Sequence, residues 1–254
     1  MRRRIGFAVG AILMLAAVGV WGQQAAPVAA PPVSDWERQH QIQLREDWPD
    51  LKHFHEQNAA LAAPAAGVPR VVFMGDSITE GWKTHGVPPS PSDPGKDWVN
   101  RGISGQTTPQ MLVRFRQDVV DLKPRVVVIL AGINDIAGNT GEMTLEATED
   151  NLASMADLAQ ANGIRVVLCS VLPAFDFPWS PGKEPAPKVL ALNAWMKGYA
   201  AEKGDVYVDY HTAMKDERDG LPATLSHDGV HPLPAGYAVM APLVEAGIEK
   251  ALKN

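Results

Sequence analysis

Apolar residues gather in short, nearly unbroken runs, and longer segments of mixed polarity separate these runs. The clearest runs cover residues 71–74, 125–131 and 165–170, and a shorter one lies near 205–209. Short runs rich in β-branched residues predict buried strands, and unbroken apolarity is typical of strands covered on both faces in a parallel sheet. The stretch 97–100 also resembles a strand, although polar residues interrupt it.

Apolar residues at helical spacing fill the segments between these strands. One helix is predicted to begin near Thr108 and Pro109, because a threonine followed by a proline is typical of a first helical turn. Further helices are predicted around 145–158, over 186–203 and after Pro232, whereas the five prolines within 172–187 exclude a helix or a central strand there. Strands that alternate with helices predict a single α/β domain with a doubly wound parallel sheet.

The first 33 residues differ in composition from the rest of the chain. Three arginines at 2–4 precede an uncharged stretch over 5–21 and then small residues, which is the layout of a secretory signal. We therefore expect a signal peptide over 1–22, a flexible tether over 23–33 and one folded domain over 34–254. Residues 34–63 are predicted to form a helical extension that Pro49 divides in two. The protein is expected to be secreted or periplasmic, and retention of the signal as an anchor is the alternative.

Composition limits the partners and the chemistry. The net charge is −6 and no basic run occurs beyond the three arginines at 2–4, which argues against nucleic acid as a partner. Cys169 is the single cysteine, so no intrachain disulfide can form, and its place inside an apolar run predicts a packed thiol. His40, His53 and His55 lie among polar neighbours in the extension and are interpreted as surface residues. Residues 86–97, rich in proline, serine and glycine, are predicted to form an exposed loop.

Side chains suited to catalysis follow the predicted strands. Ser77 comes shortly after the run 71–74, Gly102 and Asn134 follow two later strand-like segments, and Asp228 and His231 lie in the last loop before the closing helix. Because the carboxyl ends of parallel strands share one edge of a sheet, we expect these residues to meet there.

These residue types suit acyl transfer from an ester. Ser77 can act as the nucleophile and His231 as the base, while Asp228 can orient the imidazole. The backbone N–H groups of Ser77 and Gly102 and the side-chain amide of Asn134 are candidates for an oxyanion hole.

Four sequence blocks occur in order: Gly-Asp-Ser-Ile at 75–78, Asn-Arg-Gly-Ile-Ser-Gly at 100–105, Gly-Ile-Asn-Asp at 132–135 and Asp-Gly-Val-His-Pro at 228–232. Over about residues 68–250 the chain resembles the SGNH hydrolase superfamily, also called the GDSL-type esterases and lipases. The resemblance implies a three-layer α/β/α sandwich with a mainly parallel, flavodoxin-like sheet. It also implies a triad of Ser77, Asp228 and His231, an oxyanion hole of Ser77, Gly102 and Asn134, and ester hydrolysis without metal or cofactor.

The segment around Gly102 is similar to the platelet-activating-factor acetylhydrolase-like and carbohydrate acetylesterase branches. We therefore expect an exported serine hydrolase that cleaves short-acyl, chiefly acetyl, esters of carbohydrates or small alcohols. A lysophospholipase, a thioesterase or an acyltransferase on the same residues stays open, as does a non-catalytic glycan-binding protein. The expected partner is a small-molecule or polysaccharide ester, with no nucleic acid and no stable membrane insertion after signal cleavage. Acyl length and oligomeric state are open.

Other motif interpretations fit less well. Thr79 stands where the nucleophile elbow of α/β-hydrolases has a glycine. The glycine spacing over 75–84 differs from that of a phosphate-binding loop. His227 and His231 would need a helix to share a metal ion, and Gly229 opposes one, so a metal site is not expected.

Three aromatic residues, Trp82, Phe177 and Trp179, allow two interpretations. They line the substrate pocket, or they pack loops onto the sheet.

Overall fold

The computed structural model describes residues 34–82 and 96–253, which we call the described residues. The predicted signal peptide, the tether and most of the predicted loop over 86–97 lie outside them.

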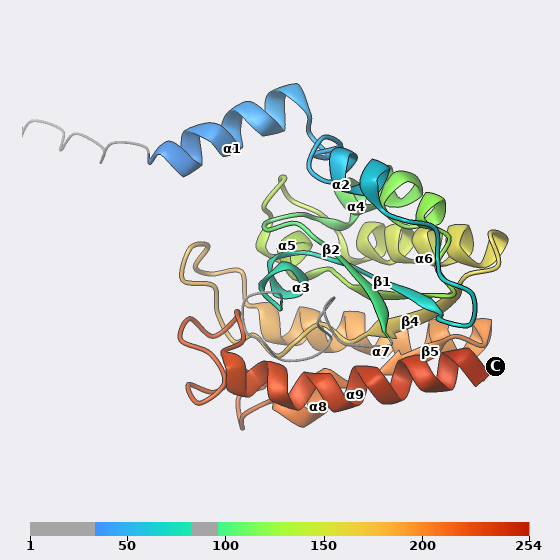
Figure 1. The fold of residues 1–254 in the computed structure, drawn as a ribbon. Coiled ribbons are helices and arrows are strands. Elements are labelled where there is room, and N and C mark those ends of the chain that lie inside the picture. The colour runs from blue at the N-terminus through green and yellow to red at the C-terminus, as the bar shows by residue number, and fades with distance from the viewer. Residues whose placement is uncertain (1–33, 83–95, 254) are drawn as a thin grey trace, which may run out of the picture.

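A five-stranded sheet forms the centre of the molecule (Figure 1). Neighbouring strands are all parallel, and their order is β2-β1-β3-β4-β5. The strands are β1 (Arg70–Gly75), β2 (Asp97–Gly102), β3 (Val126–Leu130), β4 (Arg165–Cys169) and β5 (Val206–Val208). The predicted α/β class with a parallel sheet is confirmed, and the strand order is the flavodoxin-like one.

Helices cover both faces of this sheet. In Figure 1, α4 and α6 lie on one side of the sheet and α9 on the other; α7 packs against α6, and α9 packs against β3, β4 and β5. The helices are α1 (Asp35–Glu46), α2 (His55–Ala60), α3 (Ser77–Gly81), α4 (Thr108–Asp118), the 3-10 turn η1 (Val120–Leu122), α5 (Ile133–Ala137), α6 (Leu145–Ala161), α7 (Pro185–Lys203), α8 (Tyr210–Met214) and α9 (Pro234–Lys253).

Local sequence explains where α4 begins. The Thr107 N–H and hydroxyl both donate to Gln110 Oε1, at 3.0 and 3.2 Å, and Pro109 lies in the first turn. These bonds to the third helical residue and an early proline both favour a helix start, so the predicted start of this helix is confirmed.

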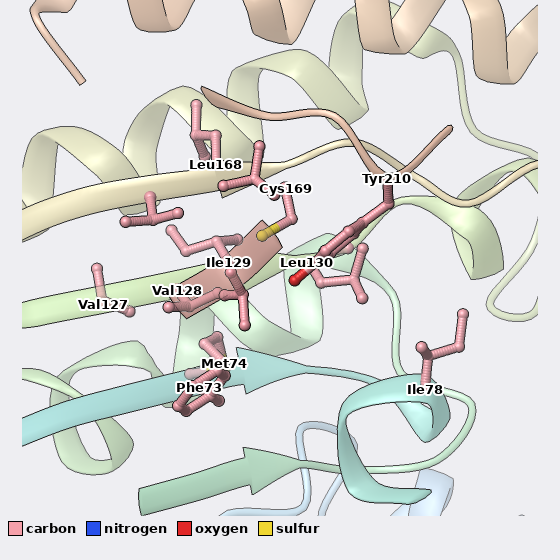
Figure 2. Packing of buried hydrophobic residues seen from close by; sticks show 14 of the residues in the cluster. Phe73, Met74, Ile78, Val127, Val128, Ile129, Leu130, Leu168, Cys169 and Tyr210 are labelled. Atoms are coloured by element: carbon pink, nitrogen blue, oxygen red, sulfur yellow. The ribbon is translucent and has the colours of Figure 1, made fainter. Parts of the chain in front are cut away.

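Buried hydrophobic side chains pack together where β1, β3 and β4 adjoin (Figure 2). Phe73, Val128 and Val167 follow one another across these strands in register, and all three are buried. Cys169 is fully buried beside Tyr210, and burial raises the pKa of its thiol to about 12. The prediction of a packed thiol is confirmed, and a raised pKa disfavours the reactive thiolate.

The strand order creates a switch point between β1 and β3. The chain leaves β1 toward β2 at one edge of the sheet and leaves β3 toward β4 on the opposite side. In such sheets a crevice forms outside the carboxyl ends of the two diverging strands. Ser77 follows β1 and Asn134 follows β3, so both residues are placed at this crevice.

The N-terminal extension is helical, but its helices are shorter than the predicted range 34–63. A turn over 47–54 separates α1 from α2, which confirms Pro49 as the break between them. Backbone carbonyls at 48, 49 and 51 accept hydrogen bonds from the side chains of Gln110, Gln106 and Gln117, at 2.7, 2.8 and 2.8 Å. These bonds attach the extension to α4 and to the turn that precedes it.

None of the helices in the described residues combines the length and the apolar character that a membrane crossing needs.

Candidate active site

Ser77 is the first residue of α3, directly beyond the end of β1. The preceding residue, Asp76, caps the helix, since its carboxylate accepts the N–H of Ile78 at 3.0 Å. Gly75 ends the strand, and a Cβ at this glycine would lie 2.1 Å from Thr79 Oγ1 and 2.8 Å from the Leu130 carbonyl oxygen. Glycine therefore lets the strand turn sharply into α3, and the turn presents Ser77 at the sheet edge.

The structure brings Ser77, His231 and Asp228 into one chain of contacts. Ser77 Oγ lies 3.0 Å from His231 Nε2, and His231 Nδ1 lies 2.6 Å from Asp228 Oδ2. Ser77 is 154 positions from His231 in the sequence, whereas Asp228 precedes His231 by three. The hydroxyl, imidazole and carboxylate are thus within hydrogen-bonding distance in the order that nucleophilic catalysis requires.

A tight turn holds Asp228 in place. Its Oδ1 atom accepts the N–H groups of Val230 and His231 at 2.9 and 2.8 Å and the hydroxyl of Ser226 at 3.0 Å. Gly229 supplies the left-handed backbone that this turn needs, with φ of +78°.

Asp228 stays ionised in this setting. Partial burial raises the pKa of its carboxyl, but hydrogen bonds from the His231 ring and from two backbone N–H groups outweigh that effect and lower the pKa to about 2. An ionised Asp228 favours the tautomer of His231 that carries its proton on Nδ1, so Nε2 is free to accept the proton of Ser77.

Asn134 is buried at the start of α5, on the other side of the switch point. One N–H of its side-chain amide donates to the Gln106 carbonyl at 3.0 Å, and its Oδ1 accepts from Asn139 Nδ2 at 2.9 Å. These two contacts fix the direction of the amide and leave its second N–H without a hydrogen bond to any described residue. This N–H remains available for the predicted role of Asn134 as an oxyanion donor.

Gly102 does not fill its predicted role, and this prediction is wrong. Its N–H already donates to Asn100 Oδ1 at 2.9 Å in a buried setting. A Cβ at this position would lie 2.2 Å from the backbone nitrogen of Glu80. The glycine is needed because β2 and α3 approach each other closely here, and not because its N–H faces a substrate.

The turn after β2 offers a different backbone donor. Gly105 has φ of +78°, and its carbonyl accepts from Asn139 Nδ2 at 3.2 Å, the same nitrogen that contacts Asn134. Within the described residues the Gly105 N–H donates no hydrogen bond. In the sequence, the feature that could have indicated Gly105 as a backbone donor is its place as a second glycine, three positions after Gly102.

The buried side chain of Arg114 supports this side of the site, although it is not among the residues predicted from the sequence. Its guanidinium donates to the Gly75 carbonyl at 3.0 Å, to Gln106 Oε1 at 2.5 Å and to Asp118 Oδ2 at 3.1 Å. Burial lowers the pKa of Arg114, and Asp118 opposes that shift. The sequence feature that could have indicated this buried ion pair is an arginine and an aspartate four positions apart among the apolar residues of α4. The pair joins the end of β1 to the turn that carries Gly105.

Asp76 and Asp135 are buried acids beside the site. Burial raises the pKa of Asp76 to about 7 and also raises the pKa of Asp135. Asp135 accepts the N–H and hydroxyl of Thr108, at 3.0 and 2.5 Å, and so ties α5 to the start of α4. This contact gives Asp135 a structural role.

The three ambiguous aromatic residues separate into two groups. Trp82 is buried against Phe73 and Tyr237, and Phe177 is fully buried, so both belong to the core. Trp179 is 45% exposed, and its ring centroid lies 5.9 Å from that of His231.

Two further features complete the surroundings of the site. A cavity of about 330 Å³ lies beside the Gly105 turn, and the N-terminal extension supplies one of its walls through Gln43 and His53. His227 is exposed and directly precedes the catalytic loop, residues 228–231. The described residues contain no cluster of three or more histidine, cysteine or acidic side chains that could hold a metal ion.

Comparison with known proteins points to one family. The model of the GDSL-like lipase/acylhydrolase family matches residues 73–239. The structure of a GDSL-like lipase from Bacteroides thetaiotaomicron is 44% identical with a TM-score of 0.76, covering 81% of this chain and 100% of that one.

Two curated relatives are acetylxylan esterases. The one from Xylanibacter ruminicola is 27% identical over 75% of this chain, and the match spans only 45% of that protein. The one from Geobacillus stearothermophilus is 29% identical over 56% of this chain and 68% of its own length.

Proposed function

Because this chain belongs to the GDSL-like lipase/acylhydrolase family of carboxylic ester hydrolases, we propose that it removes short acyl groups, chiefly acetyl, from carbohydrate esters. The observation that carries the proposal is the contact chain from Ser77 through His231 to Asp228, at 3.0 and 2.6 Å. The acetylxylan esterases among the relatives support acetylated saccharides as the substrate class.

The first half of the reaction acylates Ser77. Its hydroxyl oxygen attacks the ester carbonyl carbon while His231 Nε2 takes the hydroxyl proton. The carbonyl oxygen becomes an oxyanion, which we assign to the N–H groups of Ser77 and Gly105 and the free amide N–H of Asn134. The bond from carbon to the alcohol oxygen then breaks, and His231 gives its proton to the departing alcohol.

The second half releases the acid. Water attacks the acyl carbon, His231 takes a proton from that water, and the same donors hold the oxyanion. The bond to Ser77 Oγ breaks, the proton returns to this oxygen, and the carboxylic acid leaves. Asp228 keeps its negative charge throughout and stabilises the imidazolium form of His231.

We also propose that the enzyme acts outside the cytoplasm, on the basis of the charged, then apolar, then small-residue pattern over 1–22. Mass spectrometry of the protein from a periplasmic or culture fraction should find a first residue near Gln23. A protein that stays in the cytoplasm with its first residues intact would contradict export.

The central test compares the wild type with Ser77→Ala. The wild type should release acetate from acetylated xylan and from p-nitrophenyl acetate, and Ser77→Ala should release neither above background. Ser34→Ala, in the extension, is the matched control and should keep full activity. Acetate release by Ser77→Ala would overturn the role of Ser77. Wild-type activity on p-nitrophenyl acetate but on no acetylated saccharide would overturn the substrate class alone.

A further inference from the structure

The proposed reaction fixes where the alcohol half of the ester must lie. His231 Nε2 passes its proton to the departing oxygen, so that oxygen comes within about 3 Å of this nitrogen. The carbonyl oxygen points instead toward Asn134, on the other side of the switch point. The group carried on the alcohol oxygen therefore extends over the surface next to His231.

Trp179 occupies this surface. Its indole ring is tilted by 36° against the imidazole of His231, with 5.9 Å between centroids, and 45% of the residue is exposed. An exposed tryptophan next to a general base presents a large apolar face to whatever the alcohol oxygen carries.

The indole is held in place. Phe177 is fully buried, and its ring packs on Trp179 with centroids 5.3 Å apart. Ser180 anchors the other side, because its hydroxyl donates to the Ala137 carbonyl at 3.2 Å and its N–H donates to the Phe177 carbonyl at 3.0 Å. The ring is thus fixed before any ligand binds, which lowers the entropic cost of binding against it.

The neighbouring chemistry suits a sugar better than a fatty chain. A cavity of about 190 Å³ adjoins the catalytic loop, and its walls combine Phe175 with the charged side chains of Asp176, Arg218 and Asp228. Within the described residues of 172–184 and 215–231, the exposed large apolar side chains are two aromatics, Phe175 and Trp179. Aromatic faces beside charged hydrogen-bonding groups match the apolar C–H face and the hydroxyl rim of a pyranose ring.

We infer that Trp179 is a specificity-determining residue, on which the saccharide ring that carries the ester stacks while His231 protonates its departing oxygen. The inference rests on the proposed function and deepens it, because it assigns the alcohol side of the substrate to one residue. Stacking on Trp179 selects esters of ring-shaped alcohols and leaves the chemistry at Ser77 unchanged.

The experiment compares two acetate esters that differ in the alcohol. Acetylated xylobiose carries sugar rings, whereas ethyl acetate has no ring to stack. Trp179→Ala should lower kcat/KM for acetylated xylobiose by roughly tenfold to a hundredfold, the range expected for loss of one stacking aromatic ring, and chiefly through a higher KM. The same variant should change kcat/KM for ethyl acetate by less than about threefold.

Two variants and one profile separate binding from other effects. Trp179→Phe should restore most of the activity on acetylated xylobiose, since it keeps an aromatic face. Trp48→Ala, which removes another exposed tryptophan, should leave both substrates unaffected. The pH–rate profile of Trp179→Ala on ethyl acetate should match that of the wild type, because a residue that acts through His231 would shift it.

Each contrary outcome has a distinct meaning. An equal loss on both esters, or a shifted pH profile, would show that Trp179 supports His231 and would overturn the inference. No loss on acetylated xylobiose would overturn it as well. In either case Ser77-dependent hydrolysis of ethyl acetate by the wild type would leave the esterase proposal standing, and loss of that hydrolysis would refute the esterase proposal itself.

Discussion

The catalytic groups come from two regions that are held in place in different ways. Around the nucleophile, Asp76, Asn134 and Arg114 are 1%, 5% and 0% exposed, and the contacts of Asn134 and Arg114 join distant parts of the chain. Around the base, the side chains of Asp228 and His231 are 39% and 45% exposed. Apart from the contacts of His231 with Ser77 and Trp179, their contacts lie within a turn of a few residues.

The difference teaches where stability and reactivity reside. The nucleophile region is part of the folded core, so a change there alters packing as well as chemistry. The base region is a small local structure on the surface, so a change there alters chemistry while the fold keeps its contacts. Substitutions in the two regions should therefore separate rate from stability.

The largest expected effect is on rate, in the base region. His231→Ala should lower kcat by roughly 10⁴-fold or more, since loss of a correctly placed base disables a triad of this kind. The melting temperature should change little, because the ring is half exposed and the turn that carries it keeps its backbone hydrogen bonds to Asp228. Acetate release and thermal unfolding measure the two quantities. A large drop in melting temperature would contradict the local character of this region.

The next effect is on stability, in the nucleophile region. Asp118→Ala leaves Arg114 as a buried charge without its ion-pair partner, which should cost about 3–5 kcal/mol in the free energy of unfolding. Urea unfolding measures this cost.

The control is the double variant Arg114→Met with Asp118→Leu. It should recover most of the stability, because replacing a buried ion pair by apolar side chains is often close to neutral. It should still have a lower kcat than the wild type, since the Gly75 carbonyl and Gln106 lose their donor. A double variant as unstable as Asp118→Ala would show that packing, and not the unpaired charge, causes the loss.

The smallest effect is the pH dependence of stability. The contribution of Asp76 to stability should fall as the pH rises, whereas that of Asp228 should fall as the pH drops. The pKa of buried Asp76 is raised to about 7, so its contribution to stability is present below pH 3.8 and is lost as the pH rises toward 7. The pKa of Asp228 is lowered to about 2, so its contribution is present above pH 3.8 and is lost as the pH falls toward 2. Because Asp228 is well exposed, solvent screening should limit its share to less than about 1 kcal/mol.

These two opposite pH dependences are tested by comparing melting curves of Asp76→Asn and Asp228→Asn with those of the wild type. The melting temperature of Asp76→Asn relative to the wild type should rise between pH 4 and 7. That of Asp228→Asn relative to the wild type should fall between pH 2 and 4. Parallel curves in both windows would mean that neither carboxyl has a shifted pKa in the folded protein.

The sequence by itself determined the fold class and much of the site. Apolar runs such as 125–131 must be buried on both faces, and strands of this kind that alternate with helices form a parallel sheet whose carboxyl ends share one edge. The glycine before Asp76 and the spacing of Asp228 and His231 are local features, so the turn at Ser77 and the position of the base could be predicted from neighbouring residues.

Only the tertiary structure decided which groups face the crevice. Gly102 and Gly105 both suit a backbone donor in sequence, but the contact of Asn100 with Gly102 and the approach of Glu80 give Gly102 a packing role. Phe177 and Trp179 likewise share one loop, and burial sends the first into the core while the second lies beside His231. The physical reason is the same in both cases: a local pattern specifies which hydrogen bonds and surfaces a residue offers, and only residues brought from elsewhere in the chain decide which of them are used.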